Sequence, residues 1–139
     1  MNQKNSLLNL AVLAVLVTLP ACASVDSIII AEPDVAFSLP VGKTAGVAGS
    51  TTRLTFRQVR EDSRCPTNVV CVWEGDAKIE LLPVREGAAG QSVILSLHTP
   101  NEGQVGDLFV RFVGLTPYPA TPEPSSPPQY VAELVIRRL

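Results

Sequence analysis

The segment YVAELVIR, residues 130–137, decides the fold class of this chain. Every second residue from Tyr130 to Ile136 is apolar, and these positions alternate with Val131, Glu133, Val135 and Arg137. Successive side chains of a β-strand point to opposite faces, so this alternation predicts a strand with one buried face.

The same period of two recurs upstream, in residues 53–57, 77–81 and 93–98. Turn-forming residues separate these runs, at Gly49-Ser50, at Glu86-Gly87 and at Pro100 to Gly103. The nearly continuous apolar run 108–113 predicts a more deeply buried strand. No helical stripe of convincing length follows the N-terminal segment. About seven strands at this spacing predict a single antiparallel β-sandwich, with a small barrel as the alternative.

Residues 116–129 hold six of the twelve prolines in the chain. Proline cannot donate a hydrogen bond to a sheet, so this stretch is expected to be an extended loop between the last two strands. The simpler interpretation is a stiff surface connection. The alternative is a polyproline-type ligand for an aromatic groove on a partner.

The N-terminus has the pattern of an export signal. Lys4 precedes an apolar stretch from Leu7 to Leu19, which suits a signal peptide and falls short of the roughly 20 residues that span a bilayer. The stretch ends in Leu-Pro-Ala-Cys at residues 19–22, which resembles the bacterial lipobox. That resemblance implies cleavage before Cys22 and lipidation of its thiol. Ordinary secretory cleavage near Ala21 or Ala23 is the alternative.

These signals divide the chain into three parts. Residues 1–21 are expected to be the signal peptide, residues 22–33 a lipid-anchored tether, and residues 34–139 the all-β domain. Within the tether, the apolar run 28–30 either packs on the domain as a short edge strand or lies near the lipid headgroups.

Charge and cysteine content fit an exported domain. The formal net charge is −2 and no basic patch is present, so nucleic acid is not expected as a partner. Three cysteines are an awkward odd count in an oxidising compartment, but lipidation of Cys22 would leave Cys65 and Cys71 as an even pair. Export makes a disulfide between them chemically permissible.

The most distinctive stretch is EDSRCPTNVVCVWEGDA, residues 61–77. A bridge between its two cysteines would close a small ring, which Pro66 would stiffen further. Trp73 lies two residues beyond Cys71, so on an extended segment both would share a face, and we expect the indole to pack on the disulfide. Gly75 allows the chain to turn into the next strand.

Two charged residues flank the entrance of this loop. Asp62 can accept hydrogen bonds from loop N–H groups in an Asx-type turn, and Arg64 follows two residues later. The simplest interpretation of the whole stretch is a stapled connection that plugs one end of the sandwich.

This stretch also resembles a set of uncharacterised bacterial secreted proteins and lipoproteins that carry Asp-Ser-Arg-Cys-Pro, a short loop and Cys-x-Trp-x-Gly. The matching positions here are Asp62 to Pro66, Cys71, Trp73 and Gly75. A looser similarity extends to residues 39–43, 54–56, 115–119 and 130–135. The resemblance implies export, a β-rich fold and a Cys65–Cys71 bridge, and it implies no established activity.

Catalytic and metal-binding patterns are weak. His98 is the only histidine, and no Gly-x-Ser-x-Gly motif accompanies it. The spacing of the two loop cysteines does not match a Cys-x-x-Cys redox centre. Glu74, Asp76 and Glu80 lack the spacing of a calcium loop and are expected to be solvated surface charges. The sequence therefore predicts no catalytic residue, no metal site and no cofactor.

Together these observations predict a lipid-anchored envelope protein with a non-catalytic binding or structural β domain. Its expected partners are the membrane, through the lipid on Cys22, and an unidentified envelope protein or ligand. If the organism has two membranes, Ala23 after the lipidated cysteine favours the outer one. The alternatives are a protease-inhibitor-like module that uses the loop 65–71 and, third, a hydrolase of unrecognised type.

The lipobox gives the first prediction. Mass spectrometry of the membrane-bound protein should find a mature N-terminus at Cys22 that carries lipid, because the apolar stretch ends directly before Leu19 to Cys22. An unmodified N-terminus at any other residue would contradict lipidation.

Overall fold

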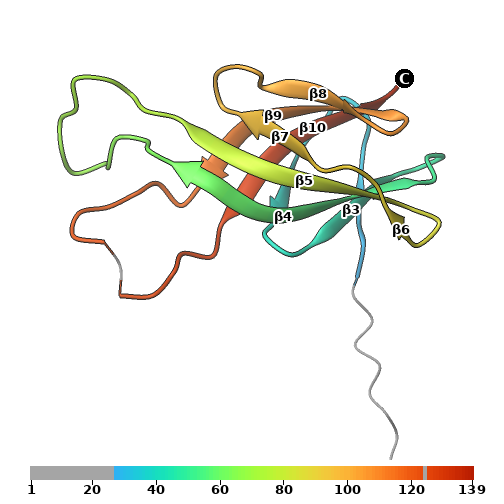
Figure 1. Cartoon of the computed structure of the whole chain (residues 1–139), viewed down its shortest axis with the longest axis horizontal. Helices are drawn as coiled ribbons and strands as arrows, with labels where there is room; N and C mark the ends of the chain where they lie inside the picture. The colour runs from blue at the N-terminus through green and yellow to red at the C-terminus, as the bar shows by residue number, and fades with distance from the viewer. Residues whose placement is uncertain (1–26, 124) are drawn as a thin grey trace, which may run out of the picture.

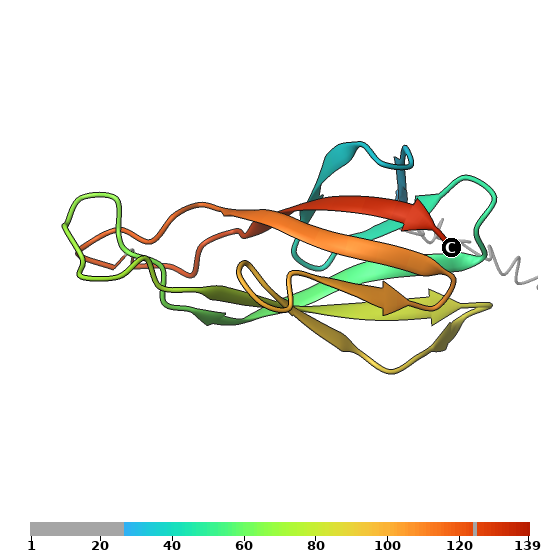
Figure 2. The same cartoon turned by 90° about the horizontal axis from the view of Figure 1, so that it is seen from above.

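The computed structural model describes residues 27–123 and 125–139, so the expected signal peptide and Cys22 lie outside the described residues. Within that part of the chain there is no helix, and hence none that could cross a membrane. Two β-sheets pack face to face without closing into a barrel (Figures 1 and 2), which confirms the predicted all-β sandwich. The ten strands are β1 Ile29–Ala31, β2 Ala36–Pro40, β3 Thr44–Val47, β4 Thr52–Asp62, β5 Ala77–Arg85, β6 Ala88–Ala89, β7 Val93–Ser96, β8 Glu102–Val105, β9 Leu108–Thr116 and β10 Val131–Arg138.

The first sheet has the strand order β1-β3-β4-β5-β6, and β7 also pairs with β5. β1 runs parallel to β3, with Ile29 opposite Ala45, so the sheet is mixed and the expectation of a purely antiparallel sandwich is wrong. Of the two alternatives for the run 28–30, the structure shows the edge strand. The folded part of the chain therefore begins within the predicted tether, before residue 34.

The second sheet has the order β2-β10-β9-β8 and is antiparallel throughout. Its central strand β10 is the segment whose alternation predicted the fold, and Ala132, Leu134 and Ile136 are all fully buried. They face Leu54, Phe56, Ile79 and Leu81 of the first sheet in one continuous core. Period-two burial thus places the apolar face of each sheet against the other.

The run 108–113 is half-buried rather than buried on both sides. Leu108, Val110 and Phe112 point into the core, whereas Arg111 and Val113 are exposed. The outer face of β9 is exposed because no third layer formed by residues 27–123 or 125–139 covers the second sheet. The expectation of a more deeply buried strand is therefore wrong, although the strand itself is confirmed.

Two long connections leave the same end of the sandwich (Figure 1). The disulfide loop, residues 63–76, joins β4 to β5, and the proline-rich loop, residues 117–130, joins β9 to β10. The second loop confirms the predicted extended connection between the last two strands. The C-terminus and β1 lie in the other half of the molecule (Figure 2).

Adjacent residues of β9 provide a test of this packing. Phe112→Ala should lower the free energy of unfolding by about 3–5 kcal/mol, because it leaves a cavity between the sheets. Val113→Ala on the outer face should change it by less than about 0.5 kcal/mol. Denaturant unfolding measures both, and similar losses at the two positions would contradict the register of β9.

Candidate functional site

The disulfide loop continues the β4–β5 hairpin beyond its regular strands. The Ser63 amide donates to the carbonyl of Asp76 at 2.8 Å, and the Cys65 amide donates to the carbonyl of Glu74 at 2.9 Å. Cys65 and Cys71 are bridged, with their Cα atoms 5.9 Å apart, which confirms the expected pairing. The bridge closes the crest of the loop into a small ring.

Gly75 is needed where the chain turns into β5. Its φ of +73° lies in the left-handed region, and a Cβ atom there would approach the carbonyl oxygen of Ser63 to 1.8 Å. Any larger residue would clash with the backbone of the opposite loop segment. The predicted role of Gly75 in the turn is therefore correct, and the contact with Ser63 gives its reason.

Arg64 is the buried centre of this end of the molecule, with only 4% of its surface exposed. Its Nε and Nη2 atoms donate to the two carboxylate oxygens of Asp62 at 2.7 and 2.8 Å. Nη1 donates to the carbonyl of Leu115, and Nη2 also donates to that of Pro117 at 2.8 Å. The guanidinium lies 4.3 Å from the ring centre of Tyr118. Arg64 therefore ties the disulfide loop to the end of β9 and to the start of the proline-rich loop.

Asp62 completes this cluster from the end of β4. Besides the guanidinium, it accepts a long hydrogen bond of 3.4 Å from the Arg64 amide, which is the predicted Asx-type turn, and a 3.1 Å bond from the Tyr130 hydroxyl. Burial alone would raise the pKa of Asp62, but the hydrogen bonds and charge of Arg64, with the Tyr130 bond, lower it overall. Burial and the bond to Asp62 in turn raise the pKa of Tyr130.

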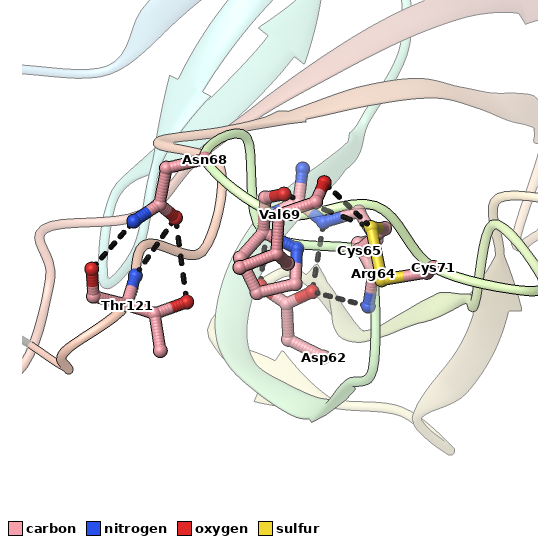
Figure 3. The surroundings of a disulfide bond; sticks show 8 residues. Asp62, Arg64, Cys65, Asn68, Val69, Cys71 and Thr121 are labelled. Atoms are coloured by element: carbon pink, nitrogen blue, oxygen red, sulfur yellow. Dashed lines mark hydrogen bonds and ion pairs between the residues drawn. A yellow bond between two sulfur atoms is a disulfide. The ribbon is translucent and has the colours of Figure 1, made fainter.

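A second set of contacts joins the crests of the two loops (Figure 3). The Asn68 side-chain amide donates to the carbonyl of Thr121, and its oxygen accepts from the Thr121 amide at 3.1 Å. The Thr67 amide donates to the carbonyl of Pro119 at 3.3 Å. The two loops thus form one unit that projects from the sandwich.

Trp73 is 83% exposed, so the expectation that it packs on the disulfide is wrong. The expectation assumed an extended segment, in which residues two apart share a face, but residues 71–76 lie outside the strands and β5 begins only at Ala77. The loop likewise does not plug the end of the sandwich, because it protrudes from it.

The crest of the disulfide loop carries an exposed apolar surface, called here the apolar tip. It consists of Val69, Val70, Val72 and Trp73, of which Val70 and Val72 are fully exposed. No charged residue occurs from Cys65 to Trp73. Four exposed apolar side chains within five consecutive positions are uncommon on a small domain, and such groups are typical of surfaces that contact another molecule.

The carboxylates that were expected to be solvated have different roles. Asp76 accepts hydrogen bonds from the Ser96 hydroxyl at 2.6 Å and from the Ala77 amide at 2.8 Å, which fixes the base of the loop. Glu80 is buried and bonds Gln58 at 2.7 Å as well as two arginines of β4. For these two residues the expectation was wrong, whereas Glu74 is exposed.

His98 lies exposed just beyond β7, and its Nε2 is 2.8 Å from the carbonyl of Gly75. In residues 27–123 and 125–139, no group of three His, Cys, Asp or Glu side chains is placed to hold a metal ion. The structure therefore directs attention to the two loops rather than to a metal centre.

The comparisons with known proteins found no match: no family model, no curated protein and no solved structure is similar to this chain. The site is therefore interpreted from its own geometry.

Sequence analysis singled out Asp62 and Arg64 as flanking the loop but did not reveal their partners. The carbonyls of Leu115 and Pro117 lie more than fifty residues further along the chain. The alternating pattern predicts for Tyr130 only a place on the core face of a strand, and no pattern singles out Asn68. A hydrogen bond to a backbone carbonyl requires no particular side chain there, so no residue pattern could have indicated these contacts.

The Asp62–Arg64 pair gives a stability prediction with a matched control. Asp62→Asn should lower the free energy of unfolding by about 3–5 kcal/mol at neutral pH, since it leaves the Arg64 charge buried without its partner. Glu61→Gln removes the exposed pair between Glu61 and Lys78 and should cost at most about 1 kcal/mol. Equal losses in thermal or denaturant unfolding would contradict the central role of the buried pair.

The pH dependence of the same variant has a defined sign. The folded-state pKa of Asp62 is below its ordinary 3.8, so its carboxylate stabilises the fold fully above about pH 4. That stabilisation is lost as the pH falls through the folded-state pKa. The stability difference between the wild type and Asp62→Asn should therefore be constant near neutrality and shrink in acid. A difference that grows below pH 4 would contradict the assignment.

Proposed function

We propose that this chain is an exported, lipid-anchored binding module that presents the apolar tip to a protein partner in the cell envelope. The observation that carries the proposal is the exposure of Val70, Val72 and Trp73 on a loop held by a disulfide and by buried hydrogen bonds. Trp is among the residues that contribute most to binding at protein interfaces, and apolar anchors act best when a partner desolvates them fully.

The rigidity of the loop supports binding rather than a purely structural role. A segment that is already ordered loses little conformational freedom when it enters a partner's cleft, so more of the contact energy appears as affinity. Arg64 and Asn68 attach the loop to the proline-rich loop, and the disulfide constrains its crest. None of the exposed side chains of the tip is needed for these contacts.

The position of the proposed lipid anchor fits an orientation in which the apolar tip points away from the membrane. β1 lies in the half of the molecule away from the two loops (Figure 2). Six residues separate Cys22 from Ile29 and could extend over about 20 Å. A domain held close to its membrane through that end would direct the apolar tip away from the bilayer. The lipobox and the resemblance to uncharacterised bacterial lipoproteins support the same location.

A protease-inhibitor-like module is the second candidate, and the protruding loop favours it specifically. The ring from Cys65 to Cys71 carries Val69 and Val70 at its crest, where an enzyme's substrate cleft could receive them. The two candidates share the surface and differ in the partner. Inhibition of a purified protease by the wild type, lost in a Val70→Asp variant, would select this second function.

The tip should be dispensable for folding and required for binding. A Val70→Ser, Trp73→Ser double variant should melt within a few degrees of wild type, because these side chains contact solvent. The control Ile94→Ser removes an apolar residue that is also exposed, at 48%, from β7 outside the tip. Envelope proteins captured by wild type and by the control, but not by the tip variant, would support the proposal. A partner that all three retain would contradict it.

Fluorescence gives an independent measurement, because Trp73 is the only tryptophan. In the free protein its emission should be red-shifted and readily quenched by acrylamide. Addition of the captured partner should shift the emission to the blue and protect it from quenching. An emission that stays unchanged when the complex forms would exclude the tip from the interface.

A further inference from the structure

A separate pocket lies beneath the proline-rich loop, with a volume of about 560 Å³. This is within the usual range for small-molecule sites. Its walls are formed by the proline-rich loop and by the end of β4. Aromatic and apolar lining comes from Tyr118, Tyr130 and several prolines, including Pro127 and Pro128. Neither Trp73 nor the valines of the apolar tip line this pocket, so it is a different site.

Tyr118 presents an electron-rich ring to this pocket. The Arg64 guanidinium already lies 4.3 Å from the ring centre, which shows that the ring accepts a cation. More than half of the Tyr118 surface, 54%, is still accessible. Tyr118 therefore keeps accessible surface while it lines the pocket.

The charge of the lining is negative. Asp62 reaches the pocket wall, but both its oxygens are engaged by Arg64 and one also accepts from Tyr130. Glu123 is exposed, and no hydrogen bond or ion pair joins its carboxylate to another described residue. It lies close enough to Tyr130 to help raise the pKa of the phenol. Glu123 and the two tyrosines thus line the same pocket, and no cation among the described residues pairs with the Glu123 carboxylate.

We propose that this pocket binds a small organic cation, of the alkylated ammonium class. The ammonium group would lie against Tyr118 and Tyr130, with Glu123 as its counter-charge and the proline rings against its methyl groups. Aromatic faces attract such cations electrostatically, and a nearby carboxylate adds to the attraction. An anion would instead meet Glu123 without a compensating cation, because the charge of Arg64 is neutralised by Asp62.

Choline is the probe, and 3,3-dimethyl-1-butanol is its control, since it has the same shape without the charge. In ¹H–¹⁵N spectra of the folded, disulfide-bonded protein, choline should shift the amides of the non-proline residues of the proline-rich loop, such as Tyr118 and Tyr130, and the neutral alcohol should shift them far less. Equal shifts from both compounds would show that the pocket recognises apolar shape and not positive charge, and would contradict the proposal. No shift from choline at tens of millimolar would overturn the proposal.

Glu123→Gln tests the counter-charge with the fold intact, because the side chain is exposed. It should weaken choline binding about two- to fivefold, the size expected for one exposed charge contact. Glu74→Gln, in the neighbouring loop, removes the same charge outside the pocket and should leave the affinity unchanged. Equal weakening by both variants would indicate general attraction by negative charge and would contradict a built site.

Discussion

The buried guanidinium of Arg64 is the interaction on which the loop end of this protein depends. A charge with 4% of its surface exposed is stable only when its N–H groups find acceptors. Asp62 supplies a carboxylate from the same hairpin, and two backbone carbonyls come from the end of β9 and from the start of the proline-rich loop. The hydrogen bonds can form together only if the disulfide loop and the proline-rich loop lie side by side. The hydrogen bonds of the Arg64 guanidinium therefore fix the position of the disulfide loop relative to the proline-rich loop.

This constraint explains how a small sandwich can carry an exposed apolar tip without burying it. The core is formed by the alternating faces of the two sheets and does not need Val70 or Trp73. The disulfide and the turn at Gly75 shape the loop locally, while Arg64 anchors it to the sheets. The tip is thus held away from the core by polar contacts, and its apolar side chains are available to a partner. The proposed binding role rests on this difference: the core stabilises the fold, and the polar contacts leave the apolar tip exposed.

The sequence predicted those features that local patterns control. Period-two alternation located β10 and placed Ala132, Leu134 and Ile136 in the core. Turn residues located the connections at Gly49-Ser50 and Glu86-Gly87, and the even cysteine pair located the bridge, but the predicted turn from Pro100 to Gly103 ends inside β8, which begins at Glu102. The alternation could not show that β1 runs parallel to β3, because a pairing direction leaves no trace in the burial pattern of a three-residue strand.

The errors at the site have a common physical origin. The expectation for Trp73 assumes an extended chain, in which it shares a face with Cys71. Residues 71–76 instead lie outside the strands, so residues two apart need not share a face. The expectation that Asp76 and Glu80 are solvated follows from the usual exposure of charged residues, whereas Ser96 and Gln58 supply their hydrogen bonds from other strands. In each case the deciding contact joins residues that are distant in sequence or lie outside regular strands.

The central claim is that the loop from Cys65 to Trp73 is held in one conformation before any partner binds. Backbone ¹⁵N relaxation of the free protein tests it most directly. The account predicts order parameters across these residues close to those of β4 and β5, about 0.8 or above. Values below about 0.6 in this segment, with the strands rigid, would show that Arg64 and the bridge do not hold the loop, and would contradict the account.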